Sequence, residues 1–137
     1  MLSGRSHYRI LIVDDNVDAG ELLQMMMEME GYEVHVACDG RAALIDARTF
    51  RPHIVLSDIV MPGMSGYELA AALRREGFGS ETLIIAISGY AGNYPEAEKD
   101  ASHFDAFLSK PVAYADICDR LASHVAHASL LQAQVSR

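Results

Sequence analysis

Three aspartates are the residues of this 137-residue chain with the clearest capacity for chemistry. Asp14 and Asp15 follow an apolar run at residues 8–13, and Asp58 follows a second run at residues 53–57. Both runs are short and rich in β-branched residues, as in strands buried on both faces of a parallel sheet. If the two strands are neighbours, the three carboxylates meet at one edge, and their repulsion requires a counter-ion. Oxygen ligands favour a hard cation, so the pattern predicts a Mg²⁺ site beside a reactive aspartate, which is apparatus for phosphoryl chemistry.

The elements that must position these aspartates alternate along the chain. Apolar runs predict five strands, at residues 8–13, 33–37, 53–57, 82–87 and 105–108. Apolar residues at helical spacing predict five helices, at residues 16–30, 39–48, from 65 onward, 95–102 and 112–127. Asp39 can cap the second helix, while Ser65 and Glu68 have the spacing of a capping box. Residues 128–137 either continue the last helix or fray, and the pattern leaves both open.

The apolar spacing also predicts which helix faces point inward. The first helix is expected to turn these residues toward the sheet: Ala19, Leu22, Leu23 and Met26. The helix at residues 95–102 has only Ala97 and Ala101 for its inner face, so we expect it to be the least firmly packed element.

This alternation predicts an α/β fold, a doubly wound five-stranded parallel sheet with helices on both faces. In such folds, functional side chains collect at the carboxyl ends of the strands. Polar residues that directly follow the predicted strands should therefore lie along one rim: Asp14, Asp15, Asp58, Ser88 and Lys110.

The composition suits one globular domain, because the chain is 50% hydrophobic. A net charge of −8 and a pI of about 5.1 argue against direct binding of nucleic acid. The pair Arg74-Arg75 is too short for a basic patch, and we expect an ordinary solvated helix end there.

No feature of the sequence indicates a membrane or an oxidising compartment. No apolar stretch reaches the roughly 20 residues that span a bilayer, and the first residues lack the apolar segment of a signal peptide. Cys38 and Cys118 fit no metal-binding spacing, so we expect buried free thiols. We therefore expect a cytoplasmic protein.

The ordered set of rim motifs resembles the response-regulator receiver domain of two-component signalling, a flavodoxin-like fold. The matching motifs are Asp14-Asp15, the segment from Ser57-Asp58 to Ser65-Gly66, Ser88-Gly89 and Lys110-Pro111. The resemblance covers residues 8–127, which leaves an N-terminal extension at 1–7 and a C-terminal tail at 128–137. It implies the strand order 2-1-3-4-5, in a stand-alone receiver or one excised from a larger protein.

Carried over to matching positions, the resemblance implies a role for each rim residue. Asp58 would accept a phosphoryl group from a phosphohistidine of a histidine kinase or histidine phosphotransfer protein. Asp15 and Asp58 would bind Mg²⁺ directly, Asp14 through water, and the Val60 carbonyl would complete the protein ligands. Lys110 would pair with a phosphoryl oxygen.

The same resemblance implies a switch and a phosphoryl lifetime. Ser88 would move toward the phosphoryl group while Phe107 turns inward, altering the surface of the fourth helix, fifth strand and fifth helix that partners contact. Val60 and Tyr90 occupy the two variable positions beside the site, and neither side chain orients an attacking water easily. We therefore expect slow self-dephosphorylation and no turnover of external substrates.

Three rival readings differ in their chemistry. A flavin-binding module would need a Ser/Thr/Gly-rich loop after the first strand, where Asp14-Asp15 would repel the flavin phosphate. A hydrolase of the aspartyl-phosphate type normally has a second acid two residues after its nucleophile, where this chain has Val60. A receiver-like interaction domain that works without phosphorylation is the remaining alternative.

Overall fold

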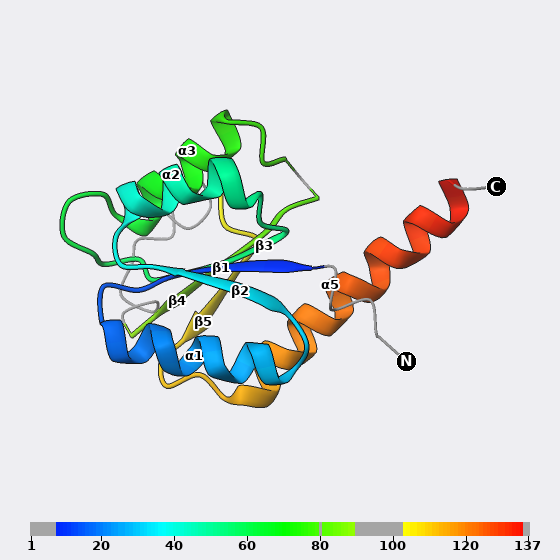
Figure 1. The fold of residues 1–137 in the computed structure, drawn as a ribbon, viewed down its shortest axis with the longest axis horizontal. Helices are drawn as coiled ribbons and strands as arrows, with labels where there is room; N and C mark the ends of the chain where they lie inside the picture. Colours follow the sequence, from blue (N-terminus) through cyan, green and yellow to red (C-terminus); the bar gives the residue numbers. More distant parts are fainter. Residues whose placement is uncertain (1–7, 80, 90–102, 136–137) are drawn as a thin grey trace.

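The computed structural model describes residues 8–79, 81–89 and 103–135, and within them five strands form one parallel sheet (Figure 1). The strands are β1 (Arg9–Val13), β2 (Glu33–Ala37), β3 (Ile54–Ser57), β4 (Leu83–Ser88) and β5 (Ala106–Ser109). Their order is β2-β1-β3-β4-β5, so the expected doubly wound sheet and its 2-1-3-4-5 order are confirmed.

Helices cover both faces of this sheet. They are α1 (Val17–Met29), α2 (Gly40–Phe50), α3 (Gly66–Arg75) and α5 (Tyr114–Val135). Figure 1 shows α2 and α3 on one side and α1 and α5 on the other. The helix expected at residues 95–102 lies outside the described residues. Alternate side chains of the buried strands face the two layers, so Leu11 and Val13 pack toward α2 and α3 while Ile10 and Ile12 pack toward α1 and α5.

Side-chain caps begin three of these helices close to the places that the sequence predicts. The side chains of Asn16, Asp39 and Ser65 each accept a hydrogen bond from the backbone N–H three residues further on. The Glu68 carboxylate in turn accepts a hydrogen bond from the backbone N–H of Ser65 at 2.9 Å, which completes the predicted capping box. These local bonds fix where α2 and α3 leave the rim of the sheet.

The exposure of three side chains corrects the sequence analysis. Leu22 was expected to face inward but is 57% exposed, and Met27 is fully buried instead. Helix α1 packs through Gly20 and Met27, which lie seven residues apart on one face, whereas Leu22 is rotated away from that face. Cys38, directly after the edge strand β2, is exposed, and Cys118 is half-buried, so the expectation of two buried thiols was wrong for Cys38 and holds only in part for Cys118.

Arg74 also differs from the solvated helix end that we expected. Its side chain is only 17% exposed, and its guanidinium pairs with Asp105 at 2.9 Å. It also donates to the carbonyl oxygens of Phe78, Gly79, Thr82 and His103. Arg75 is exposed as expected. Phe78, Gly79 and Thr82 belong to the segment that directly follows α3, whereas His103 and Asp105 reach Arg74 only when the chain folds.

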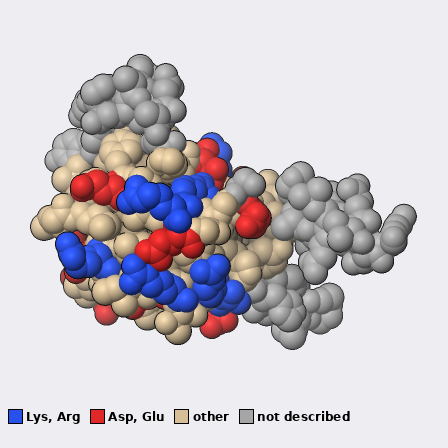
Figure 2. All heavy atoms as spheres, turned by 90° about the horizontal axis from the view of Figure 1, so that it is seen from above, with Lys and Arg blue, Asp and Glu red and all other residues tan. Residues whose placement is uncertain are grey.

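The α2–α3 layer carries a mixture of charges. Figure 2 looks onto this layer and shows Lys and Arg side chains lying around acidic ones. One such contact joins α2 to the end of α3, where Arg48 Nη2 lies 2.7 Å from Glu76 Oε2. Both side chains are exposed to solvent, which screens the attraction, so this pair adds little to stability.

Helix α5 continues to Val135, which decides between the two possibilities for the tail in favour of helix. Figure 1 shows its C-terminal half projecting away from the sheet and the other helices. Within the described residues, no helix combines the length and the hydrophobicity that a membrane-spanning segment requires.

Candidate functional site

The register of the sheet brings the aspartates together. Val13 of β1 pairs with Ser57 of β3, so the next residues, Asp14 and Asp58, leave adjacent strand ends. The backbone ladder continues one step further, because the Asp58 N–H donates to the Val13 carbonyl at 2.9 Å. The Asp14 N–H likewise donates to the Ala37 carbonyl of β2 at 3.1 Å. Both carboxylates therefore start from backbone that is held by the sheet.

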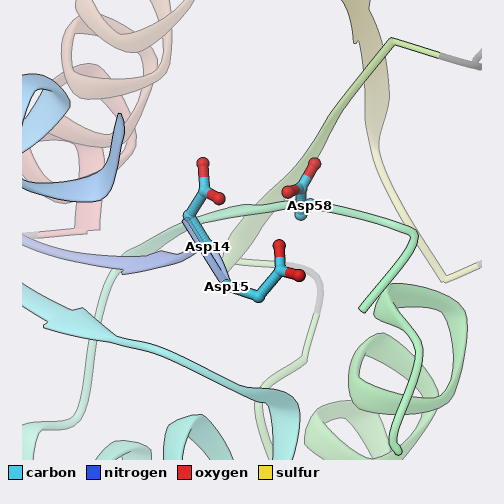
Figure 3. A group of neighbouring side chains, drawn as sticks. All are labelled: Asp14, Asp15 and Asp58. Carbon is cyan, nitrogen blue, oxygen red and sulfur yellow. The ribbon is translucent and has the colours of Figure 1, made fainter. Parts of the chain in front are cut away.

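Asp14, Asp15 and Asp58 form a compact cluster of carboxylates (Figure 3). One oxygen from each lies within 4.8 Å of the others. The Asp14 and Asp58 side chains are 11% and 12% exposed, while the Asp15 side chain is open to solvent. Three oxygen donors at this spacing, with one side open, fit a hard divalent cation such as Mg²⁺.

Lys110 lies against the same cluster. Ser88 of β4 pairs with Ser109 of β5, and Lys110 follows directly at that end of the sheet. Its Nζ lies 3.2 Å from Asp58 Oδ1 and 3.6 Å from Asp14 Oδ2. The lysine offsets part of the repulsion, but one cation faces three acidic side chains. The cluster therefore keeps an excess of negative charge.

Burial and the neighbouring charges at the rim raise the pKa of Asp58 from 3.8 to about 6. Burial is the main cause, and the neighbouring Asp14 adds to it, while Lys110 acts in the opposite direction. Burial lowers the pKa of Lys110, but its contacts with Asp58 and Asp14 outweigh this, so that pKa is raised overall. Asp58 is thus a carboxylate whose charged form is disfavoured until a cation arrives.

Gly66 lets the N-terminus of α3 approach the backbone of Asp58 and Ile59. Its N–H donates to the Ile59 carbonyl at 2.7 Å. A Cβ at this position would lie 2.2 Å from the Asp58 carbonyl oxygen and 2.8 Å from the Ile59 Cα. Only a residue without a side chain fits here. The glycine therefore sets the path of the chain directly after Asp58.

The other predicted site residues either lie outside the carboxylate cluster or are not described by the structure. Val60 is 56% exposed, two residues after Asp58. Phe107 is half-buried, with ring centroids 5.5 Å from Phe104 and 6.4 Å from Tyr67. Ser88 is the last residue of β4, at the same end of the sheet as Lys110, but its side chain lies outside the described part. Tyr90 lies outside the described residues altogether.

Sequence reasoning missed two features of this rim. It paired Lys110 with a phosphoryl oxygen and did not foresee its contact with Asp14. It also gave no role to Gly66, although a glycine directly after the capping residue Ser65 was a signal of close backbone approach. The Lys110–Asp14 contact joins segments that are remote in the chain, whereas the approach of Gly66 to Asp58 depends on how the loop between them folds back.

The chain matches one family model and is similar in sequence to known proteins. A family model described as response regulator receiver domain matches residues 10–122. An uncharacterized 14.6 kDa protein of Leptolyngbya boryana is 37% identical over 103 residues, which are 75% of this chain and 79% of that protein. The DNA-binding response regulator MtrA of Mycobacterium tuberculosis is 40% identical over 68 residues, 50% of this chain and 30% of MtrA. This chain therefore matches less than a third of the length of MtrA.

A solved structure extends the likeness to three dimensions. The receiver domain of a sensor histidine kinase from Pseudomonas aeruginosa was crystallised with a magnesium ion coordinated in its active site cleft. It is 25% identical to this chain and superposes with a TM-score of 0.78, covering 87% of this chain and 98% of the receiver.

Proposed function

This chain belongs to the response-regulator receiver family, and on that premise we propose that Asp58 is the phosphoacceptor of a two-component signalling switch. The observation that carries the proposal is the position of Asp58 Oδ1, 3.2 Å from the Lys110 ammonium and inside a cluster of three carboxylates. Among the described residues, no other grouping of three His, Cys, Asp or Glu side chains has the spacing of a metal site.

The proposed reaction is an in-line displacement at phosphorus. A carboxylate oxygen of Asp58 attacks the phosphorus of a phosphohistidine on a partner protein. The new O–P bond forms as the P–N bond breaks, and the imidazole leaves with the electron pair of that bond. The product is an aspartyl phosphate on this chain and a free histidine on the partner.

Asp14, Asp15 and Asp58 would hold Mg²⁺, together with the backbone carbonyl of Val60. When bound, the ion supplies positive charge that offsets repulsion between the anionic acceptor and the anionic phosphoryl group. The excess of negative charge and the raised pKa of Asp58 support this, because both favour a cation at the rim. The magnesium in the Pseudomonas aeruginosa receiver lends further support.

Lys110 would change partners during the reaction. In the structure its ammonium contacts Asp58 and Asp14. Once Asp58 carries the phosphoryl group, Nζ can donate to a phosphoryl oxygen with little movement, since it already lies within hydrogen-bond distance of the reacting carboxylate. Lys110 would thus hold the charge of the product rather than transfer a proton.

Ser88 and Phe107 would couple phosphorylation of Asp58 to a change in the surface that partners contact. Ser88 ends β4 at the rim, and Phe107 lies on the neighbouring strand β5, where its ring packs on the α2–α3 side of the sheet beside Phe104 and Tyr67. Movement of Ser88 toward the phosphoryl group would let the half-buried Phe107 turn inward. The partners would be a histidine kinase or histidine phosphotransfer protein and a downstream protein target, in the cytoplasm.

We propose that the chain catalyses only its own phosphorylation and dephosphorylation and does not turn over external substrates. Val60, two residues after Asp58, is a solvent-exposed aliphatic side chain that offers no proton to a leaving group or a water. Self-dephosphorylation is accordingly expected to be slow.

The test is phosphorylation by acetyl phosphate in the presence of Mg²⁺, read by intact mass. The wild type should gain one phosphoryl group, and Asp58→Asn should gain none. Asp39→Asn is a matched control, because it removes a carboxylate elsewhere while asparagine still caps α2. An unmodified wild type that still binds Mg²⁺ would refute the proposal and favour an interaction domain that works without phosphorylation.

A further inference from the structure

A second feature of the rim is an apolar cavity between α1 and α5, on the face of the sheet that these two helices cover. Its volume is about 140 Å³. Its floor consists of the strand residues Ile12, Leu56 and Ile87, and its half-buried walls include Leu23 of α1 and Val112 just before α5. The cavity reaches the rim at Asp14, Asp58 and Lys110.

The size and lining of the cavity suit one small apolar group. An engineered apolar cavity of about 150 Å³ stays dry and binds benzene, which sets the scale for a single six-membered ring. A buried water needs two to four polar partners, and the floor residues Ile12, Leu56 and Ile87 are aliphatic. The inner part of the cavity therefore favours a hydrocarbon over water.

The charged residues at the mouth of the cavity, Asp14, Asp58 and Lys110, determine which charge a bound molecule can carry there. Two carboxylates, Asp14 and Asp58, face one ammonium, Lys110, so the mouth is acidic overall. Each carboxylate has two oxygens with about four acceptor sites, so Lys110 does not exhaust them. A second ammonium group can be accommodated there, whereas a carboxylate would be repelled.

We propose that the α1–α5 cavity binds a small primary amine with a compact apolar body, whose ammonium group lies on Asp14 and Asp58. The apolar body replaces empty space against Leu23 and Val112, and the ammonium adds a charged contact at the rim. Amine and Mg²⁺ would share two carboxylates, so each should weaken the binding of the other by the same factor. Amine binding itself does not require phosphorylation of Asp58.

The experiment is a methyl NMR titration of the full chain, free of metal, with three probes of similar ring size. Benzylamine carries an ammonium, toluene is neutral and benzoate is an anion. Saturable shifts of the Leu23, Met26 and Val112 methyl groups are expected with benzylamine. Toluene should bind about fivefold more weakly, a difference typical of one partly exposed ion pair. Benzoate should give no saturable shifts, and added Mg²⁺ should weaken benzylamine binding.

Adjacent leucines provide a matched pair of variants. Leu23→Phe fills the cavity and should abolish the shifts, whereas Leu22→Phe makes the same change on the exposed side of α1 and should leave binding unchanged. Val112→Leu is a smaller filling change if Leu23→Phe does not fold. Absence of saturable shifts with benzylamine, equal binding of benzoate, or the same loss in Leu22→Phe would overturn the proposal. Acetyl phosphate labelling without amine tests the phosphoacceptor separately, so the two proposals can fail independently.

Discussion

Replacing Asp58 by asparagine should make the metal-free protein more stable at neutral and alkaline pH. The rim carries three acids against one lysine, and burial together with the neighbouring Asp14 raises the pKa of Asp58 from 3.8 to about 6. A raised folded-state pKa means that the folded protein binds this proton more tightly than the unfolded chain does. Ionised Asp58 therefore destabilises the fold, and asparagine keeps the shape of the side chain without its charge.

The size of the effect follows from the pKa. A rise from 3.8 to about 6 corresponds to roughly 3 kcal/mol at about 1.36 kcal/mol per unit. Solvent reaches this rim and screens part of the interaction, so we expect about 1–2 kcal/mol in the free energy of unfolding. The cost starts near the unfolded pKa of about 4 and is complete above about pH 6, so the advantage of the variant should fade as the pH falls through that window.

Urea unfolding with a chelator, near pH 8 and near pH 4, measures the difference directly. Asp39→Asn, which removes an acid but keeps the helix cap, should show no comparable gain. Excess Mg²⁺ should stabilise the wild type more than Asp58→Asn, because the variant lacks one of the three carboxylates. A variant that is less stable than the wild type in chelator at pH 8, or a gain that does not change with pH, would refute the electrostatic reasoning.

Three further predictions concern the frame around the site. Arg74→Met should destabilise the protein by about 2–4 kcal/mol, because it removes the buried partner of several carbonyls and a carboxylate. Urea unfolding that finds Arg74→Met as stable as the exposed neighbour variant Arg75→Met would contradict this. Gly66→Ala should cost about 2–3 kcal/mol and weaken Mg²⁺ uptake, because its Cβ would collide with the backbone of Asp58 and Ile59. Gly79→Ala, with no atom closer than 3.7 Å to the new Cβ, is the control in the same unfolding and titration assays. Val60→Asn should shorten the lifetime of the aspartyl phosphate, since an amide can orient an attacking water; an equal or longer lifetime by intact mass would count against shielding by Val60.

Most of the fold was predictable because local chemistry and the buried pattern agree. The β-branched runs mark the strands, and the capping residues Asp39 and Ser65 mark two helix starts through bonds made within four residues. Leu22 was placed wrongly because the apolar pattern of α1 has more candidates than one helix face can bury, and several methionines compete for it. Arg74 was placed wrongly because the apolar pattern does not show that the chain after α3 folds back over its side chain, or that His103 and Asp105 arrive from a distant segment.

The residue types at the rim, the alternation that builds a parallel sheet and the family resemblance were all readable from the amino-acid order alone. They depend on interactions within a few positions or on motifs at strand ends. The distances were decided only by the tertiary structure: the pairing of Val13 with Ser57, the contact of Lys110 with Asp14, the close approach at Gly66 and the cavity beside α1. Repulsion, desolvation and empty volume depend on where remote segments lie relative to one another, and a linear pattern does not specify those separations.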